Sequence, residues 1–337
     1  MKRVLFYSSV KTKKMFSIQS YYRNDIQILR DLGYRVFLSN SISDFLAFWK
    51  YDIGFFYFYR YSAFGAFFSK LFGKKNVFTG GIDYLEPSFA TYNQYLLQKL
   101  FFKICNIFSD TNILVSTTDY ENVKSIYDGK IPSKCRLSFH VVDFDRFVYR
   151  GEKKDKVITT IAWMVNRDNV YRKGVDRTIR AFSLFLKHNP DYKLIIAGPS
   201  GEGSDDILEL ISQLGIENSV EYRGAISEDE KVHLLKSSMI YSQLSIYEGF
   251  GIAAIEALAA GNILVHSGRG GLKDAIGNNG YIVNIDNIDE IAEVYNRLVS
   301  NMINIDNLRE NGIRYVKNYF SYKKRLNDFQ EIFENLK

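Results

Sequence analysis

Two carboxylates, Glu248 and Glu256, lie eight positions apart in an otherwise apolar stretch of the chain. Ile252–Ala260 consists of good helix formers and is followed by Gly261, so the pattern predicts Glu248 in a loop and Glu256 in a buried helix. Because burying a lone carboxylate is costly, Glu256 needs a partner. That partner is a hydroxyl-rich ligand, solvent or a core arginine.

The spacing of the two carboxylates matches a particular ligand. Eight helical positions span about 12 Å, close to the distance from sugar to ribose in a nucleotide diphosphate sugar. One carboxylate could hold each end, while the backbone N–H groups of Phe250, Gly251 and Ile252 at the helix start favour the phosphates between. This hypothesis requires that both carboxylates face the same side.

Three cations lie together in the segment 166–174: Arg167, Arg172 and Lys173. A diphosphate leaving group needs such positive charge, because it becomes more negative as it departs. The alternative is an ordinary solvated loop. A second glycine-rich loop, Gly268–Gly271, could bring backbone amides to a sugar or phosphate.

A third candidate, Thr79–Asp83, follows a predicted strand in the first half of the chain. There Gly80 and Gly81 would let the backbone approach a ligand, and Asp83 could orient a hydroxyl group. A tight turn with a capping aspartate explains the same residues equally well.

Composition excludes several classes of protein. Of 337 residues, 46% are hydrophobic and 24% charged, which indicates a globular chain of two domains. A net charge of +6 does not indicate a nucleic-acid partner. The two cysteines and four histidines form no metal-ligand pattern, and neither half has a dinucleotide fingerprint after its first strand. We therefore expect no metal, no cofactor and no nucleic acid, and a cytoplasmic location.

Strands and helices alternate along both halves, which predicts an α/β protein of two Rossmann-like, doubly wound domains facing across a cleft. We expect the first domain at residues 1–148 and the second at 149–319. Their ligand crevices should lie at the carboxyl ends of the strands.

The segment from Phe45 to Phe72 contains fourteen aromatic residues. Most of them should be core, since aromatic side chains bury large areas. The helix face near Phe64–Phe72, with Lys70, Lys74 and Lys75, has the composition of a surface that lies on an anionic membrane. A peripheral position on the inner face of the cell membrane is therefore one expectation.

The stretch Glu248-Gly-Phe-Gly-Ile-Ala-Ala-Ile-Glu256 resembles the E-x7-E motif of family 4 retaining glycosyltransferases, which have the GT-B fold. Further matches are Lys173-Gly-Val-Asp176, Ile195-Ile-Ala-Gly198, Gly270-Gly-Leu272 and Gly280-Tyr-Ile-Val283. The resemblance covers residues 140–320.

This resemblance implies sugar transfer from a UDP- or GDP-sugar, with retention of configuration and no essential metal. The acceptor would be a glycan, a lipid-linked glycan or a protein-linked glycan used in bacterial polysaccharide or glycoconjugate synthesis. Glu248 and Lys173 would be catalytic, and Glu256 would bind the ribose. The remaining donor-binding residues would be Gly249, Phe250, Gly251, Ile252 and one arginine, Arg167 or Arg172. The first domain would bind the acceptor through Gly80, Gly81 and Asp83, and a helix at 320–337 would pack back onto it.

The sequence departs from the family in three places. No glycine pair follows the first strand, where Ser8-Ser-Val-Lys11 stands, and Thr79-Gly80-Gly81 replaces the histidine often found after the fourth strand. The third departure precedes Lys173. The usual Gly-Arg-Leu before the Lys-Gly is absent, so Arg167 or Arg172 would have to supply the second cation. A catalytically silent GT-B subunit that binds or activates a glycosylation complex is therefore the alternative hypothesis.

Overall fold

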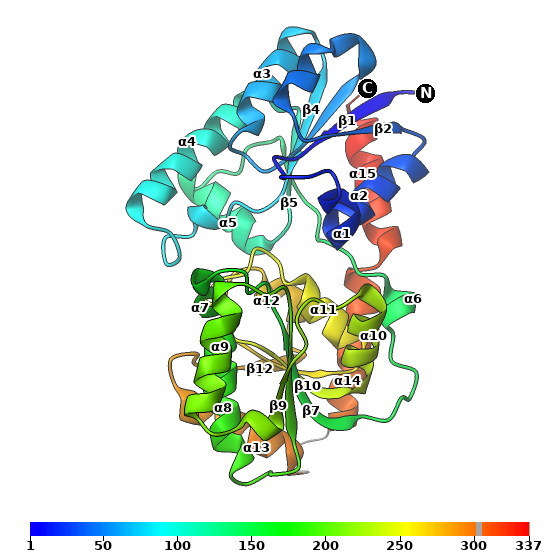
Figure 1. Ribbon diagram of the computed structural model, residues 1–337. Helices are drawn as coiled ribbons and strands as arrows, with labels where there is room; N and C mark the ends of the chain where they lie inside the picture. The colour runs from blue at the N-terminus through cyan, green and yellow to red at the C-terminus, as the bar shows by residue number, and fades with distance from the viewer. Residues whose placement is uncertain (301–304, 337) are drawn as a thin grey trace. The chain divides into compact units, whose positions relative to one another are not determined.

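The chain forms two compact units, each a parallel sheet with helices on both faces (Figure 1). The computed structural model describes residues 1–300 and 305–336. Unit 1 comprises Met1–Val141 and Tyr322–Lys337, and unit 2 comprises Val142–Ser321. The prediction of two doubly wound α/β domains is confirmed.

Unit 1 contains six parallel strands in the order β2-β1-β3-β4-β5-β6. The strands are β1 (Arg3–Tyr7), β2 (Arg35–Ser39), β3 (Ile53–Tyr57), β4 (Lys75–Thr79), β5 (Thr111–Leu114) and β6 (Cys135–Leu137). The helices are α1 (Met15–Ile18), α2 (Ser20–Asp31), α3 (Ser62–Leu71), α4 (Tyr92–Phe108), α5 (Thr117–Ile126) and α15 (Tyr322–Glu334), with 3-10 turns η1 (Ile42–Leu46), η2 (Phe48–Lys50) and η3 (Asp83–Leu85).

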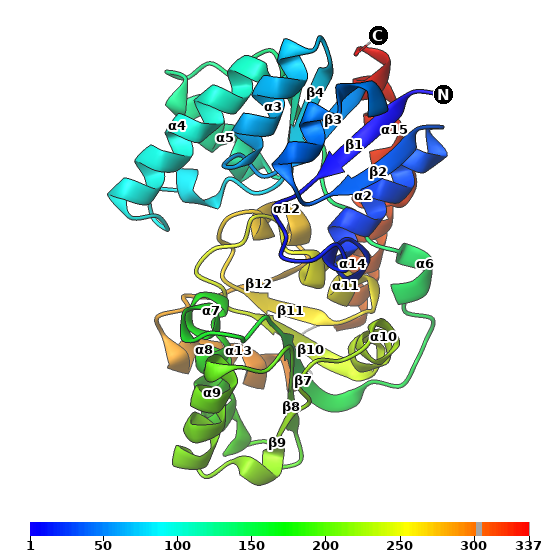
Figure 2. The ribbon, with the colours of Figure 1, turned by 45° about the horizontal axis from the view of Figure 1, so that its top comes forward.

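Each face of this sheet has its own apolar layer. Helices α3, α4 and α5 cover one face, and α1, α2 and α15 cover the other (Figures 1 and 2). Aromatic rings fill the layers: Phe6 stacks on Phe55 at 5.2 Å, and Phe45 stacks on Phe56 at 4.5 Å. Only six of the fourteen aromatic residues in 45–72 are buried, however, and six are exposed. The expectation that most of them are core is therefore wrong. The exposed aromatic residues are Phe48, Trp49, Tyr61, Phe64, Phe67 and Phe72, which lie on α3 and in the segments that flank it.

A buried ion pair fixes α15 to unit 1. The Arg325 guanidinium donates to both carboxylate oxygens of Asp25, at 2.7 and 2.9 Å, and to the carbonyl of Ser138 at 2.7 Å. Tyr57 donates its hydroxyl to the same Asp25 carboxylate. Burial opposes the charge on Arg325, but Asp25 outweighs it and the pKa of Arg325 is raised. A segment distant in sequence thus completes the core of unit 1.

Replacing Arg325 by leucine should lower the free energy of unfolding by about 3–5 kcal/mol, because the Asp25 carboxylate would stay buried without its cation. The matched control is Lys324→Met, which removes a pair between the 56% exposed Lys324 and Asp328 on the same helix and should cost less than about 1 kcal/mol. Urea unfolding followed by tryptophan fluorescence and circular dichroism measures both. Equal losses in the two variants would contradict this role of Arg325.

Unit 2 contains six parallel strands in the order β12-β11-β10-β7-β8-β9. The strands are β7 (Asp155–Ile161), β8 (Lys193–Ala197), β9 (Val220–Tyr222), β10 (Ser238–Gln243), β11 (Ile263–His266) and β12 (Gly280–Ile282). The helices are α6 (Phe144–Phe147), α7 (Arg167–Lys173), α8 (Val175–Leu186), α9 (Glu202–Gln213), α10 (Glu228–Ser237), α11 (Ile252–Ala259), α12 (Leu272–Ile276), α13 (Ile288–Val299) and α14 (Ile305–Tyr319), with the turn η4 (Glu217–Ser219).

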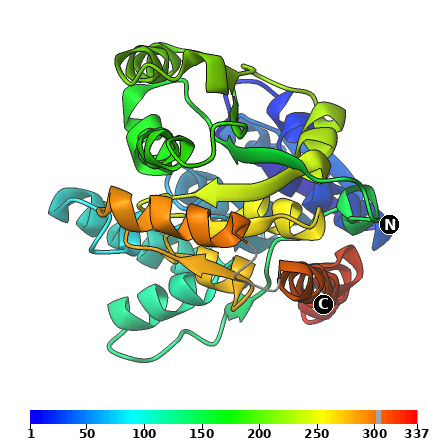
Figure 3. The same ribbon diagram turned by 90° about the horizontal axis from the view of Figure 1, so that it is seen from below.

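The strand order of unit 2 is that of the dinucleotide-binding Rossmann fold, since it reads 6-5-4-1-2-3 when its strands are renumbered from β7. Helices α8, α9 and α13 line one apolar layer, and α10 and α11 lie on the opposite side of the sheet (Figure 2). Helix α13, orange in Figure 3, packs against α8 and β11. In such a sheet a ligand crevice forms where the strand order reverses, here between β7 and β10.

Some local predictions need correction. The cationic segment 166–174 is helical and not a loop, because Asn166 caps its start and Gly174 ends it in the left-handed conformation. Residues 142–148, expected at the end of the first domain, lie in unit 2, where the Tyr149 amide that follows them donates to Ala259. The helix expected at 320–337 is α15, which belongs to unit 1, and α14 before it belongs to unit 2.

Candidate active site in the second unit

The point at which the strand order of unit 2 reverses brings two predicted residues together. Lys173 is reached from β7 through the short helix α7, and Glu248 follows β10. Because β7 and β10 are hydrogen-bonded neighbours, their carboxyl ends lie side by side. The two side chains meet there although they are 75 positions apart in the chain.

Lys173 and Glu248 form a buried ion pair. The Lys173 ammonium donates to Oε1 of Glu248 at 2.6 Å and to Oε2 at 2.7 Å. Gln243 Nε2 and the Ser245 hydroxyl also donate to Oε1, at 2.9 and 2.7 Å. Burial opposes ionisation of Glu248, but the charge of Lys173 and the hydrogen bonds from Lys173 and Ser245 outweigh it, so the pKa of Glu248 is lowered. The carboxylate is therefore ionised at neutral pH and can accept further hydrogen bonds.

Helix α7 holds Lys173 in place through its last turn. The carbonyl of Arg172 accepts a hydrogen bond from the Ile246 amide at 2.8 Å, which ties the helix end to the loop before Glu248. Gly174 follows with φ +68°, and a Cβ there would lie 2.1 Å from the carbonyl oxygen of Leu244. Only glycine permits this approach.

Gly174→Ala should therefore lower the free energy of unfolding by about 2–4 kcal/mol, through both the positive φ and the collision with the Leu244 backbone. Gly215→Ala is the matched control, because Gly215 has a similar φ of +65° with no atom within 4 Å of the added Cβ, and it should cost about 1 kcal/mol. Thermal unfolding of both variants checks the difference. If the two glycines prove equally tolerant, the contact does not constrain Lys173.

The two candidate arginines occupy different surroundings. Arg172 lies beside the ion pair: its guanidinium donates to the Tyr247 carbonyl at 3.4 Å, and its charge helps lower the pKa of Glu248. Arg167 instead pairs with Asp206 of α9 at 3.1 Å, and its side chain is 71% exposed. Of the two, only Arg172 is placed next to Lys173 and Glu248.

The start of α11 presents the backbone amides that the sequence predicted. Gly251 caps the helix with φ +109°, and the amides of Gly251 and Ile252 have no acceptor within the described part of the chain. The glycine loop 268–271 is used differently from the prediction. The Gly271 amide donates to the Glu248 carbonyl at 2.7 Å, and a Cβ on Gly270 would lie 2.2 Å from that oxygen. This loop therefore braces the Glu248 backbone.

Glu256 is 3% exposed and has a partner that the sequence did not identify. Lys231 of α10 donates to its carboxylate at 2.9 Å and pairs with Glu228 at 3.0 Å. Burial raises the pKa of Tyr241 in β10, and the charges of Glu248 and Glu256 raise it further. Each carboxylate thus has its own cation: Lys173 of α7 pairs with Glu248, and Lys231 of α10 pairs with Glu256.

His266 ends β11 and leads into the bracing loop. Its Nδ1 accepts a hydrogen bond from the Gly268 amide at 3.1 Å, which requires the neutral ring. Burial lowers the pKa of His266 from 6.5 to about 4. The folded unit therefore disfavours protonation of His266, because a proton on Nδ1 would break the hydrogen bond from the Gly268 amide.

The stability of the protein should depend on His266 in a defined pH window. Above pH 6.5 the ring is neutral in both folded and unfolded chains, whereas between pH 6.5 and 4 only the unfolded chain takes up the proton. The free energy of unfolding should fall by about 3 kcal/mol across that window because of this residue. Urea titrations at several pH values should give a shallower dependence for His266→Gln than for wild type. The exposed His188→Gln control should keep the wild-type slope, and parallel curves for all three proteins would refute the assignment.

The acceptor-side candidates lie in unit 1 beside a pocket of about 390 Å³. Gly81 and Asp83 line this pocket together with residues of α4 and of the segment that follows β3. Gly80 has φ +105°, and a Cβ there would lie 3.1 Å from the Phe58 ring, so that ring occupies the space we expected for a ligand. Gly81 is instead approached by the Asp83 carboxylate.

Three side chains of the unit 2 site were missed by the sequence analysis: Gln243, Ser245 and Lys231. Ser245 and Gln243 stand three and five positions before Glu248, so their closeness in the chain was an available signal. No such signal was available for Lys231, because its partner Glu256 lies 25 positions away. Within residues 1–300 and 305–336, no group of three or more His, Cys, Asp or Glu side chains is arranged to hold a metal ion. Nor does that part of the chain contain a helix with the length and hydrophobicity needed to cross a bilayer.

Solved structures identify the class of fold. The chain is similar to sucrose-phosphate synthase of Thermosynechococcus elongatus, with a TM-score of 0.78 and 14% identity over 100% of this chain and 99% of that one. Anabaena HepE, solved with UDP and glucose, gives a TM-score of 0.79 and 15% identity over 99% and 100%. The chain thus has the GT-B fold of glycosyltransferases, as predicted.

The family follows from the sequence of unit 2. Residues 143–318 match the model of the glycosyl transferases group 1, and the chain belongs to this family. An uncharacterized glycosyltransferase of Methanocaldococcus jannaschii is 33% identical over 204 residues, 59% of this chain and 48% of that protein. A GDP-mannose:cellobiosyl-diphosphopolyprenol alpha-mannosyltransferase of Xanthomonas oryzae is 28% identical over 194 residues, 56% and 50% of the two chains. The matches span about half the length of these relatives.

Proposed function

We propose that this chain is a retaining glycosyltransferase that moves a hexosyl or N-acetylhexosaminyl group from a UDP- or GDP-sugar to a glycan acceptor. The observation that carries the proposal is the buried Lys173–Glu248 ion pair beside the start of α11. It combines an ionised acceptor of hydrogen bonds with a cation, at the position where a Rossmann sheet binds phosphates. Membership in the group 1 family supports sugar transfer.

Each group has a role in this proposal. Glu248 accepts hydrogen bonds from donor-sugar hydroxyls, while the amides of Gly251 and Ile252 face the diphosphate. Lys173 and Arg172 neutralise the charge that grows on the diphosphate as the bond from the anomeric carbon to its oxygen breaks. The acceptor oxygen bonds to the same face of that carbon, and its proton passes to the departing diphosphate. No metal or cofactor is assigned to the reaction, because the two cations supply the positive charge.

Glu256 suits the ribose end of the nucleotide-sugar donor. Lys231 favours the ionised form of Glu256, in which the carboxylate can accept hydrogen bonds from both ribose hydroxyls. The Phe250 and Gly249 backbone lies between the two glutamates and completes the proposed donor site. Unit 2 is therefore the donor-binding unit in this proposal, and unit 1 the acceptor-binding unit.

A lipid-linked acceptor is part of the proposal. The name of the Xanthomonas relative describes a sugar acceptor carried on a diphosphopolyprenol. A glycan on such a carrier fits synthesis of a cell-surface polysaccharide or glycoconjugate at the inner face of the membrane.

Donor hydrolysis measured with a panel of UDP- and GDP-sugars tests the catalytic assignment. Glu248→Gln and Lys173→Ala should each lower kcat at least about 100-fold, since each removes a charge next to the reacting groups. Arg172→Gln should lower it about tenfold, and the matched Arg167→Gln should stay within about twofold of wild type. Mass spectrometry of the products names the donor and the sugar transferred.

Two controls keep this test decisive. Thermal unfolding must show that each variant is folded at the assay temperature, because removing Lys173 leaves a buried carboxylate. Donor binding without turnover for every donor and acceptor would instead favour a silent binding or activating subunit. An Arg167→Gln loss as large as that of Arg172→Gln would overturn the assignment of the second cation.

A further inference from the structure

Two neighbouring helices of unit 1 expose an apolar and basic surface. Helices α3 and α4 contain no acidic residue and lie side by side on one face of the sheet (Figures 1 and 2). The exposed apolar side chains recur at helical spacing, so they form a stripe on each helix. They are Phe64 (59% exposed), Phe67 (45%) and Leu71 (66%) on α3, and Leu96 (41%), Leu100 (54%) and Ile107 (67%) on α4. We call this surface the α3–α4 face.

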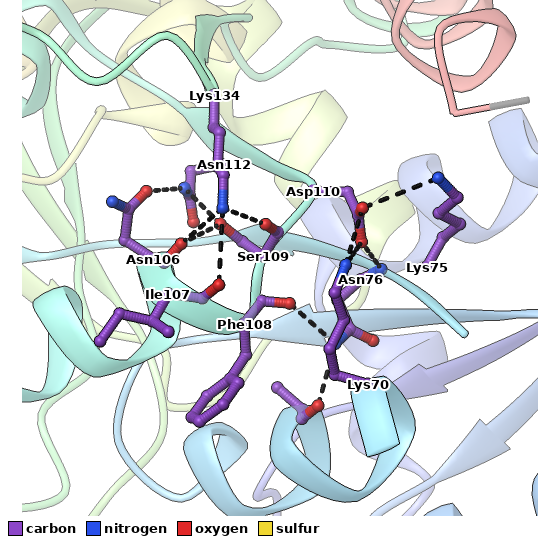
Figure 4. Close-up of polar contacts among 11 residues, drawn as sticks. Lys70, Lys75, Asn76, Asn106, Ile107, Phe108, Ser109, Asp110, Asn112 and Lys134 are labelled. Atoms are coloured by element: carbon purple, nitrogen blue, oxygen red, sulfur yellow. Dashed lines mark hydrogen bonds and ion pairs between the residues drawn. The ribbon is translucent and has the colours of Figure 1, made fainter. Parts of the chain in front are cut away.

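The lysines around this face divide into two groups. Asp110, just after α4, pairs with Lys70 at 3.0 Å and with Lys75 at 3.9 Å (Figure 4). In the same close-up, Lys134 donates to main-chain carbonyls at the end of α4, including that of Ser109 at 2.7 Å. These three cations are engaged within the protein.

Lys74, Lys99 and Lys103 have no ion pair within the described residues. Lys99 and Lys103 extend over the rings of Tyr95 and Tyr127, at 5.8 and 5.3 Å. The α3–α4 face therefore combines exposed leucine and phenylalanine side chains with lysines that form no ion pair within the described residues, although Lys74 still acts at longer range on Asp52. Apolar side chains bordered by lysines complement an anionic lipid surface.

The pocket of about 390 Å³ opens beside this face. A second stripe of α4 lines it through Gln94, Leu97 and Phe101, and Leu97 is also 41% exposed. Arg60, which follows β3, lines the same pocket and forms no ion pair within the described part of the chain. The walls are thus apolar on the α4 side, and the charged side chains that line the pocket are Arg60 and Asp83.

The backbone at this pocket is strained. Phe58 lies between β3 and Arg60 with φ +67°, a conformation that costs a bulky residue about 1 kcal/mol or more. A hydrogen bond from its amide to the Thr79 carbonyl, at 2.8 Å, holds it there. Such strain persists where the surrounding structure requires a particular backbone direction. Here the strained residue lies two positions before Arg60, which lines the pocket.

We propose that the α3–α4 face docks on an anionic membrane and that the adjoining pocket binds the phosphate-bearing lipid end of the acceptor. The apolar chain of that acceptor would lie along Leu97 and Phe101, and its phosphate would meet Arg60. The inference rests on the proposed function only in calling this lipid the acceptor. Membrane docking and lipid-phosphate binding are properties of unit 1 and need no catalysis.

Vesicle sedimentation of the full chain tests the docking surface. The protein should bind vesicles of phosphatidylglycerol and phosphatidylcholine, and bind pure phosphatidylcholine much more weakly. Lys74→Glu with Lys99→Glu should weaken binding at least about 25-fold, since one lysine near an anionic surface contributes about fivefold. Leu96→Gln with Leu100→Gln should weaken it about tenfold.

The matched controls lie in unit 2. Leu208→Gln with Ile282→Gln changes side chains that are 47% and 66% exposed, and should leave vesicle binding as in wild type. Absence of binding to anionic vesicles, or equal losses in the α4 and control variants, would overturn the docking surface.

The pocket is tested with three soluble probes: farnesyl diphosphate, farnesol and inorganic diphosphate. Farnesyl diphosphate should bind at least about tenfold more tightly than either fragment, and Arg60→Gln should weaken it about tenfold or more by removing a charge-assisted hydrogen bond. If inorganic diphosphate binds as tightly as farnesyl diphosphate, the pocket is a site for free phosphate and the lipid assignment is overturned. The lipid assignment is also overturned if Arg60→Gln binds farnesyl diphosphate with unchanged affinity.

Donor hydrolysis separates the two proposals. If farnesyl diphosphate and anionic vesicles bind as expected but no donor is turned over, the lipid site stands and the catalytic assignment fails. If donors are turned over while Arg60→Gln and the α4 variants behave as wild type, the enzyme stands and this inference fails.

Discussion

The candidate site depends on one buried ion pair, Lys173 with Glu248. Moving two opposite charges out of water costs more than their attraction returns unless hydrogen bonds complete the arrangement. Gln243 and Ser245 supply those bonds to the carboxylate. The pair thus adds little net stability, and the apolar layers around β7 and β10 must supply the free energy that keeps it buried. The consequence of burying the pair is that two charged groups are held at a fixed place next to the start of α11.

The backbone around the pair follows from this requirement. Gly174 must approach the Leu244 carbonyl, and Gly270 the Glu248 carbonyl, at distances that no side chain permits. These glycines act by close packing between loops, whereas the prediction gave the second loop a role in ligand contact. A glycine-rich loop after a Rossmann strand can therefore act on a buried carboxylate indirectly, by fixing its main chain. The same principle governs unit 1, where Arg325 and Asp25 are buried together and Tyr57 completes the arrangement.

Sequence patterns predicted the features that depend on local order. The alternation of strands and helices was enough for the two parallel sheets, and the run from Gly251 to Gly261 was enough for α11. Asn166 and Gly174 carried the cap signals of α7, but the charged residues between them suggested a loop. Lys231 could not be assigned to Glu256, because only the packing of α10 on α11 brings them together. For the same reason the choice between Arg167 and Arg172 required the position of Asp206 on α9.

The placement of α15 affects the order in which the protein can fold on the ribosome. Unit 2 is one continuous stretch, Val142–Ser321, so all of its strands are available before synthesis reaches α15. Unit 1 begins first but is completed last, because Asp25 must wait for Arg325, 300 residues later, before its charge is matched. During translation the nascent unit 1 would expose the apolar layer that Phe329 and Phe333 later cover. The early strands of unit 1 therefore wait for their covering helix until all of unit 2 has been synthesised.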